Sequence, residues 1–284
     1  MIRTIRLAAL AAAFLLTTMA AAPAAADKPT TEQLLSRLST AIDNLKTLRC
    51  TVRARERVNG KYVAAVSDLK LASSPLRVYL RNQKGIEALW VTGQNDGDAW
   101  VYPNSFPYVT LNLDPNGSLM RHDQHHSLLD AGFGSIADII SGSAQRKDRA
   151  FERSFRYTGD TLVAGRPCYV LLSSFPQFHY VAYTPAKAET TTQIANKFGC
   201  GEFRIVERNG LSYEALVPAG KTLQVPNGYG RRTTVCVDQK LFLPLIVEVM
   251  DDKGLFERFE FSNIVANQPI PSEEFSRNYK GYKL

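Results

Sequence analysis

The sequence predicts an α+β protein built on a curved, largely antiparallel β-sheet with covering helices, plus an inserted βααβ module. From about residue 48 onward, short runs alternate apolar and polar residues between turn signals, which is typical of antiparallel strands. Before them, apolar residues recur at helical spacing. Between residues 179 and 226 the pattern changes to two short helical periods flanked by strands, which indicates a second folding unit inside the first.

The first expected helix begins at Thr31-Glu32, which we interpret as its cap. Its apolar stripe consists of Leu34, Leu35, Leu38, Ile42 and Leu45. A further helical segment should place Ile136, Ile139 and Ile140 on one face.

Strands and turns make up most of the remaining chain. Asn59-Gly60 is a strong β-hairpin signal, and Asn95-Asp96-Gly97 and residues 251–254 are also typical turns. The expected strands lie at residues 50–56, 63–71, 76–81, 87–92, 99–102, 110–113, 151–157, 168–173, 233–237, 245–250 and 256–261.

The segment 179–226 has its own start and stop signals. Ile194, Ala195 and Phe198 form one apolar stripe, with Thr190 as a cap and Gly199 as a left-handed terminus. A second helical period through residues 203–206 ends at Asn209-Gly210, and residues 181–183 and 223–225 alternate like strands. The expected order is strand, helix, helix, strand.

These signals resemble those of the LysM domain family, on residues 189–199 (ETTTQIANKFG), 209–211 (NGL) and 218–226 (PAGKTLQVP). The resemblance implies binding to the N-acetylglucosamine backbone of peptidoglycan or chitin, in a groove between two loops. Carried over to this chain, the two loops consist of Ala188, Glu189, Thr190 and Thr191, and of Asn209, Gly210, Leu211 and Ser212.

One departure from the LysM pattern leaves an alternative open. The family usually has Gly-Asp-Thr-Leu where this chain has Ala188-Glu189-Thr190-Thr191. Losing the glycine restricts the backbone, and Thr191 removes an apolar contact beneath the groove. The alternative is a LysM-like fold whose glycan site has decayed.

The rest of the chain resembles the superfamily of periplasmic lipoprotein carriers and receptors, LolA and LolB. The C-terminal part of the resemblance lies in residues 235–275, with Leu243-Pro244-Leu245 and the run FEFSNI at 259–264. The first half, from Arg57-Val58-Asn59-Gly60 to Leu113-Asp114-Pro115, is similar to an uncharacterised family of secreted bacterial proteins that we place in that superfamily.

This second resemblance implies an unclosed barrel whose apolar interior holds acyl chains. A concave sheet with more apolar side chains than it can pack gains a helical lid or binds a hydrophobic ligand. The candidates for the cavity lining are Val52, Val78, Leu80, Trp90, Trp100, Leu111, Val247 and Phe259. The alternative is that they form a packed core, since a one-residue slip of register reverses the inward set.

The first residues have the features of a secretory signal peptide. Arg3 and Arg6 form a basic region, an apolar stretch follows over residues 7–22, and Ala24-Ala25-Ala26 offers a cleavage site. We therefore expect a signal peptide at 1–26 and a periplasmic mature protein with no transmembrane segment. The formal charge of the chain is +7, and removing Arg3 and Arg6 leaves about +5. No dense basic run suggests a nucleic-acid partner.

The four cysteines are Cys50, Cys168, Cys200 and Cys236. If residues 179–226 are an insertion, the strands at 168–172 and 233–237 become candidates for antiparallel neighbours. That would bring Cys168 near Cys236 and make a disulfide between them possible in an oxidising compartment. No Cys-x-x-Cys spacing suggests zinc or redox chemistry.

Candidate catalytic groups are poor, and we expect no enzyme, no cofactor and no metal. The cluster His122-Asp123-Gln124-His125-His126 is interpreted as a solvated loop rather than a metal site, and Asp251-Asp252 as a hairpin tip. No Gly-x-Ser-x-Gly pattern marks a nucleophile.

The sequence therefore predicts a non-catalytic periplasmic binding protein. Residues 179–226 would attach it to peptidoglycan or N-acetylglucosamine oligomers, while residues 27–178 and 227–284 would bind a lipid, a lipoprotein or an envelope protein. The alternatives are a sensor or regulatory subunit with a degenerate LysM module, and a cell-wall-acting enzyme. If the module projects from an edge of the sheet, replacing it with a short turn should leave a folded host domain.

Overall fold

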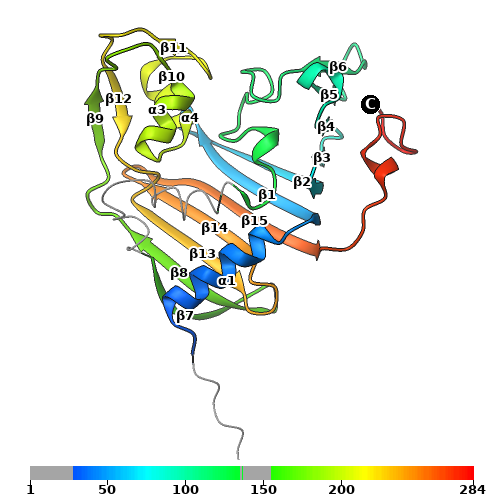
Figure 1. Cartoon of the computed structure of the whole chain (residues 1–284), viewed down its shortest axis with the longest axis horizontal. Helices are drawn as coiled ribbons and strands as arrows, with labels where there is room; N and C mark the ends of the chain where they lie inside the picture. The colour runs from blue at the N-terminus through cyan, green and yellow to red at the C-terminus, as the bar shows by residue number, and fades with distance from the viewer. Residues whose placement is uncertain (1–27, 135, 137–154) are drawn as a thin grey trace, which may run out of the picture.

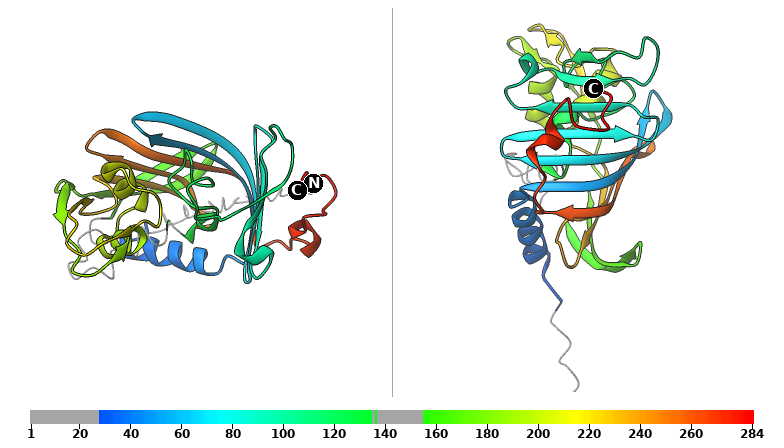
Figure 2. Two further views of the ribbon diagram at one scale, coloured as in Figure 1. Left: turned by 90° about the horizontal axis from the view of Figure 1, so that it is seen from above. Right: turned by 90° about the vertical axis from the view of Figure 1, so that its right-hand side faces the viewer.

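A single antiparallel sheet dominates the computed structural model, which describes residues 28–134, 136 and 155–284. In the described residues the sheet has eleven strands and is not closed, since β6 and β7 lie at its two edges. Figure 1 and Figure 2 show the sheet curving around an inner face. The predicted large, curved, largely antiparallel sheet is confirmed.

The strands follow the predicted positions closely. In the order in which they lie side by side they are β6 (Leu111–Leu113), β5 (Ala99–Tyr102), β4 (Glu87–Val91), β3 (Leu76–Asn82), β2 (Lys61–Ser73), β1 (Thr47–Val58), β15 (Gly254–Ala266), β14 (Pro244–Asp251), β13 (Arg232–Asp238), β8 (Arg166–Ser174) and β7 (Arg156–Val163). Asn59-Gly60 turns the β1–β2 hairpin with positive φ angles of 49° and 75°. Of the strand expected at 151–157, residues 151–154 lie outside the described residues.

The inner, concave face carries the main core. Helix α1 (Thr31–Asp43) lies across this face and buries Leu34 and Leu38 against it. Its capping residue is Thr30 rather than the predicted Thr31, because the Thr30 hydroxyl accepts a hydrogen bond from the Gln33 backbone N–H and the Gln33 side chain accepts one from that of Thr30. Of the second predicted helix only Ile136 lies within the described residues, so Ile139 and Ile140 do not.

The outer face is covered by the C-terminal segment that follows β15. Phe275, in the short helix η5 (Ser272–Phe275), packs against Tyr79 and Leu89, and the ring of Tyr282 stacks on that of Tyr79 at 3.8 Å. Glu274 accepts hydrogen bonds from both terminal nitrogens of Arg49, at 2.9 and 2.6 Å. Figure 2 shows this segment on the side of β2–β5 away from α1.

Two short helical turns and a small module complete the described fold. The turns are η1 (Asn95–Gly97) and η2 (Leu128–Asp130). The module consists of β9 (Tyr180–Tyr183), β10 (Glu189–Thr190), α3 (Thr191–Phe198), α4 (Glu202–Asn209), β11 (Leu216–Val217) and β12 (Leu223–Pro226). β9 pairs with β12, so the strand, helix, helix, strand order expected for this segment is present, with the small β10–β11 ladder added.

The helices of the module begin and end at the residues that the sequence indicates. Thr190 caps α3 in a capping box with Gln193, and Gly199 and Gly210 end α3 and α4 with left-handed φ angles of 60° and 62°. Its own small core includes Ile194, Ile205 and Val225. No helix among the described residues is long and apolar enough to cross a bilayer.

Candidate functional site

A cavity of about 600 Å³ lies between the concave face of the sheet and the segment 111–132. Its wall contains a row of cross-strand partners, Ala65, Ala54, Phe259 and Val247, which follow one another across β2, β1, β15 and β14. Two of these side chains are only methyl groups. Together with Ala88 on β4, they leave space that larger residues would fill in a close-packed core.

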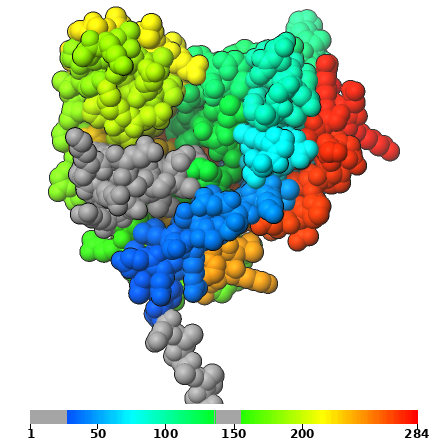
Figure 3. Space-filling model, viewed as in Figure 1, coloured from blue at the N-terminus to red at the C-terminus, as the bar shows by residue number. Residues whose placement is uncertain are grey.

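The opposite wall comes from β6 and the residues that follow it, up to Gly132. They contribute apolar side chains to the cavity: Leu111, Leu113, Leu119, Met120, Leu128 and Ala131. In the space-filling view the segment after β6 lies beside the small module on the face that also carries α1 (Figure 3). The cavity is therefore enclosed by the sheet on one side and by this segment on the other.

Five of the residues expected to line a cavity do line it: Val52, Leu80, Leu111, Val247 and Phe259. The other three do not. Val78 is fully buried in the core beneath α1, and Trp90, its partner across β3–β4, packs at the edge of that core. Trp100 lies on the outer face, against Ile270 and Phe275, because it is one residue out of phase with the inward positions of β5.

One end of the cavity is polar. Glu56 on β1 and Glu257 on β15 are direct partners across the two strands, and both line the cavity together with His126. They continue the inward alternation of Val52 and Ala54 on one strand and of Phe259 on the other. The side chains of the two carboxylates are 9% and 1% exposed, so the two acidic groups lie side by side and largely away from water.

His125, His126 and Tyr229 stabilise the two buried carboxylates through hydrogen bonds. Nδ1 of His125 lies 2.8 Å from Oε2 of Glu257, and Nε2 of His126 lies 3.1 Å from the same oxygen. The backbone N–H of His125 donates to Glu56 at 2.8 Å, and the hydroxyl of Tyr229 donates to Glu257 at 2.6 Å. The interpretation of residues 122–126 as a solvated loop is therefore wrong for His125, which is 4% exposed, and holds only for the exposed His122 and Asp123.

The charges shift the pKa values of this cluster strongly. Burial disfavours the protonated form of His126, but the attraction of Glu257 outweighs it and raises the pKa of the imidazole to about 9. Burial acts on Glu257 in the opposite sense, and its two histidine partners nonetheless hold the pKa of the carboxyl far below its usual range. Burial and Glu257 raise the pKa of the Tyr229 hydroxyl well above its usual range.

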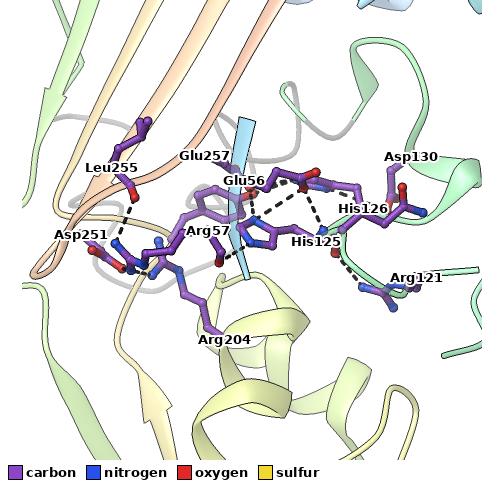
Figure 4. A network of polar contacts seen from close by, with 12 residues as sticks. Glu56, Arg57, Arg121, His125, His126, Asp130, Arg204, Asp251, Leu255 and Glu257 are labelled. Carbon is purple, nitrogen blue, oxygen red and sulfur yellow. Dashed lines mark hydrogen bonds and ion pairs between the residues drawn. The ribbon is translucent and has the colours of Figure 1, made fainter. Parts of the chain in front are cut away.

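The polar cluster continues into the small module, as Figure 4 shows. The ring of His125 is sandwiched between Phe203 of α4, at 4.2 Å, and Phe256 of β15, at 4.1 Å. Arg204 of α4 donates to Asp251 at 2.9 Å, and Arg57 of β1 donates to the same carboxylate. Both arginines outweigh burial and lower the pKa of the Asp251 carboxyl.

A second ion pair joins the module to the segment that closes the cavity. Arg121 donates to Glu202 of α4 at 2.7 Å, and Thr191 of α3 donates to the other oxygen of that carboxylate at 2.6 Å. The module therefore packs on the host through buried contacts. Arg204 and Phe203 of the module contact Asp251 and Phe256 of the host. We therefore expect removal of the module to uncover buried host residues, contrary to the expectation from the sequence that the host folds without it.

Several residues predicted to bind glycan are committed to internal contacts. The first predicted loop pairs with residues that follow the second one, because β10 pairs with β11 and the Thr191 backbone N–H donates to Ala215 at 3.0 Å. Glu189 accepts from Tyr183 and Lys197, and Thr191 is fully buried.

The other residues predicted to bind glycan differ in how exposed they are. Asn209 binds the backbone of Gln224 and Ile205 through its side chain. Thr190 caps α3 and is half-buried, like Leu211, whereas the remaining three are exposed: Ala188, Gly210 and Ser212.

The four cysteines are buried, and Cys168 and Cys236 do not form the expected disulfide. β8 and β13 are antiparallel neighbours as expected, but Cys168 pairs with Asp238, and Cys236 with Val170. The two thiols lie diagonally, two residues out of register, which does not match the direct opposition that a cross-strand disulfide favours. Burial raises the pKa of Cys50 to about 12 and that of Cys168 to about 11.

The solved structures that this chain matches have low sequence identities and low TM-scores. A chain of the MucA/MucB complex of Pseudomonas aeruginosa is 15% identical with a TM-score of 0.42, over 87% of this chain and 60% of that one. The lipoprotein LppX of Mycobacterium tuberculosis is 13% identical with a TM-score of 0.40, over 84% of this chain and 97% of that one. A LolA superfamily protein of Nitrosomonas europaea is 11% identical with a TM-score of 0.32, over 89% of this chain and 100% of that one.

All three similarities are too low to carry an argument about what this chain binds, and this chain spans only 60% of the length of the first of them. No curated protein sequence matches the chain. A family model does match residues 45–190, which is about half of the sequence and includes both β1 and the His125-His126 pair. The chain belongs to the DUF1571 family of proteins of unknown function.

Proposed function

We propose that this protein binds a hydrophobic ligand, an acyl chain with a polar head group, in the cavity under its concave sheet. The observation that supports this most directly is the cavity itself, whose volume of about 600 Å³ lies within the range of small-molecule sites, about 300–1,000 Å³. The lining is mainly aliphatic, and each methylene that enters it from water contributes about 0.8 kcal/mol.

The distribution of polar groups favours an amphiphile over a purely apolar ligand. Glu56, Glu257 and His126 gather at one end of the cavity, whereas Ala54, Ala65 and other small or aliphatic residues form its wall. A ligand with one charged or hydrogen-bonding end and a long apolar body satisfies both regions. In this role the protein is a binding protein rather than an enzyme.

Titration with a fluorescent acyl lipid whose polar head group is uncharged, so that Glu56 and Glu257 do not repel it, tests the proposal. Ala54→Trp should abolish binding, because the indole fills the space above the Ala65–Ala54–Phe259–Val247 row. Arg53→Trp is the matched control, since it places the same side chain at the neighbouring, exposed position of β1 and should bind like the unaltered protein. Equal binding by both variants, or no binding by the unaltered protein, would contradict the proposal.

A second candidate function is attachment to peptidoglycan through the module at 179–226. The observation in its favour is the antiparallel β9–β12 pair with two helices between them, in the order expected of a LysM domain. Because Glu189 and Thr191 have internal partners, we place the glycan contacts at the exposed positions Ala188, Gly210 and Ser212.

Co-sedimentation with purified sacculi tests this second function. The combined change of Ala188→Glu and Ser212→Glu should prevent pelleting, whereas Ala182→Glu, an exposed position of β9, should not. Pelleting that is the same for all variants, or no pelleting at all, excludes these loops as the glycan site. The module would then be a degenerate appendage and the protein a candidate sensor or regulatory subunit that binds an envelope protein.

The compartment is part of the same proposal. We place the protein in the periplasm after removal of residues 1–26, a segment outside the described residues. Sequencing the N-terminus of the secreted protein should give Asp27 as the first residue; a retained Met1 would contradict the proposed cleavage.

A further inference from the structure

The polar end of the cavity contains two carboxylates and one imidazole whose metal-ligating atoms face one another. Among the described residues, ligand atoms of Glu56, His125 and Glu257 all lie within 4.8 Å of each other. His126 lies beside this group, with its Nε2 3.1 Å from Oε2 of Glu257. These residues come from β1, from β15 and from the segment between β6 and η2, so only the folded protein brings them together.

The hydrogen bonds of His125 determine which of its nitrogens faces the carboxylates. Nε2 lies 3.1 Å from the backbone oxygen of Arg57, which can only accept, so Nε2 must carry a proton. Nδ1 then faces Oε2 of Glu257 at 2.8 Å, and the lone pairs of the two atoms repel each other unless a proton or a cation lies between them. A histidine held by a backbone carbonyl through one nitrogen is the usual arrangement of a metal ligand.

The separations of the donor atoms suit a small metal ion. Bonds of about 2.0–2.1 Å in tetrahedral geometry place neighbouring ligand atoms about 3.3 Å apart. The observed separations bracket this value, at 2.8 Å from His125 to Glu257, 3.1 Å from His126 to Glu257 and 3.7 Å from His125 to Glu56.

Charge balance points in the same direction. Glu56 and Glu257 are opposite one another on adjacent strands, where like charges destabilise a sheet. The nearby arginines are already paired, Arg57 and Arg204 with Asp251, and Arg121 with Glu202. A divalent cation bound by neutral histidines would compensate both carboxylates, in place of the proton on His126 that compensates one of them.

We propose that Glu56, His125 and Glu257 form a binding site for a divalent first-row transition metal ion, which His126 completes by a rotation of its ring towards the three. Imidazole and carboxylate donors suit Zn²⁺ and its neighbours in the series more than Mg²⁺ or Ca²⁺, which prefer oxygen alone. The rings of Phe203 and Phe256 hold the His125 ring in the plane that this coordination needs. The proposal does not depend on the hydrophobic ligand, because the site is complete without the rest of the cavity.

Metal analysis of the purified full chain tests the site. After incubation with Zn²⁺ and exhaustive dialysis, elemental mass spectrometry should find about one zinc per chain. Titration with Co²⁺ should produce visible d–d absorption of the intensity that tetrahedral coordination gives. Glu56→Gln and His126→Gln keep the shape of the side chains and should each lower the affinity at least ~100-fold.

His122→Gln is the matched control, because His122 lies in the same segment but its side chain is 75% exposed and outside the cluster. It should bind metal like the unaltered protein. Circular dichroism establishes that each variant is folded. If one of the two conservative variants at Glu56 and His126 fails to fold, the other still tests the site. Zinc below ~0.1 per folded chain, or equal affinity in the unaltered protein and both ligand variants, overturns the proposal.

Discussion

Arg204 of α4 and Asp251 of β14 form an ion pair of 2.9 Å with both side chains almost fully buried, at 1% and 2% exposure. The two residues belong to the inserted module and to the host sheet, and Arg57 contacts the same carboxylate from β1. Removing one partner of a buried pair leaves the other charge without compensation, which is far more costly than losing a surface pair. The module and the sheet are thus expected to unfold together.

Replacing Arg204 tests this coupling. Arg204→Ala should lower the free energy of unfolding by about 3 kcal/mol, at the lower end for a buried pair because Arg57 still contacts Asp251. Arg208→Ala, on the exposed side of the same helix, where the guanidinium lies 4.9 Å from the centre of the Tyr180 ring, should cost at most about 1 kcal/mol. Urea unfolding followed by circular dichroism measures both. Equal losses for the two variants would show that the buried pair contributes nothing of its own.

Deleting the module should damage the host. Replacing residues 179–226 with a short Gly-containing turn exposes Phe256, which is 2% exposed in the whole chain, and leaves Arg121 without Glu202. We expect a protein that aggregates or binds an apolar dye strongly. A soluble deletion variant with a cooperative transition as sharp as that of the full chain contradicts this expectation.

The C-terminal segment should detach at low pH. Hydrogen bonds from Arg49 and Lys70 outweigh burial and lower the pKa of Glu274 to about 2. Because the pKa in the folded state lies below its usual value, the ion pairs stabilise the fold above about pH 4.5 and lose this effect as the pH falls towards 2.

The variant Glu274→Gln measures that contribution. It should be less stable than the unaltered protein by about 1 kcal/mol at neutral pH, a value reduced for the solvent around Arg49. The difference should vanish as the pH approaches 2. A difference that does not change between neutral and acidic pH assigns the stabilisation to packing rather than to charge.

The cysteines should be unreactive in the native protein. All four are buried, and burial raises the pKa of Cys50, Cys168 and Cys236, which suppresses the nucleophilic thiolate. Without reductant, thiol titration should find slow reaction in buffer and four thiols per chain in denaturant. A count of two thiols in denaturant would indicate one disulfide per chain and would support the Cys168–Cys236 pairing, which the strand register disfavours.

Local signals explain why most of the fold is predictable. The Asn59-Gly60 turn, the capping box of Thr190 and the left-handed termini at Gly199 and Gly210 act within a few residues, and each appears where the sequence indicates. The strand periodicity gives the positions of the strands but not the phase of each one. That is why Leu80 lines the cavity while Trp100, on a strand whose phase is one residue different, lies on the outer face.

The buried polar cluster depends on contacts that no local pattern encodes. His125 stands in a polar run that has the pattern of a loop. It is buried because it contacts Glu56 and Glu257 and because Phe203 covers its ring. The two glutamates lie 69 residues before it and 132 residues after it, beyond the reach of any local pattern. One signal was available. Glu56 and Glu257 occupy inward positions of otherwise apolar alternations, where a lone carboxylate requires a partner.

The ligand stoichiometry of the intact protein tests the central claim most directly. Native mass spectrometry of delipidated protein with a monoacylglycerol, whose head group is uncharged, should give one bound molecule per chain, none for Ala54→Trp, and one again for Arg53→Trp. A complex with Ala54→Trp as abundant as that with the unaltered protein would place the ligand outside the cavity, and the absence of any complex would mean that the concave face is only a loosely filled core.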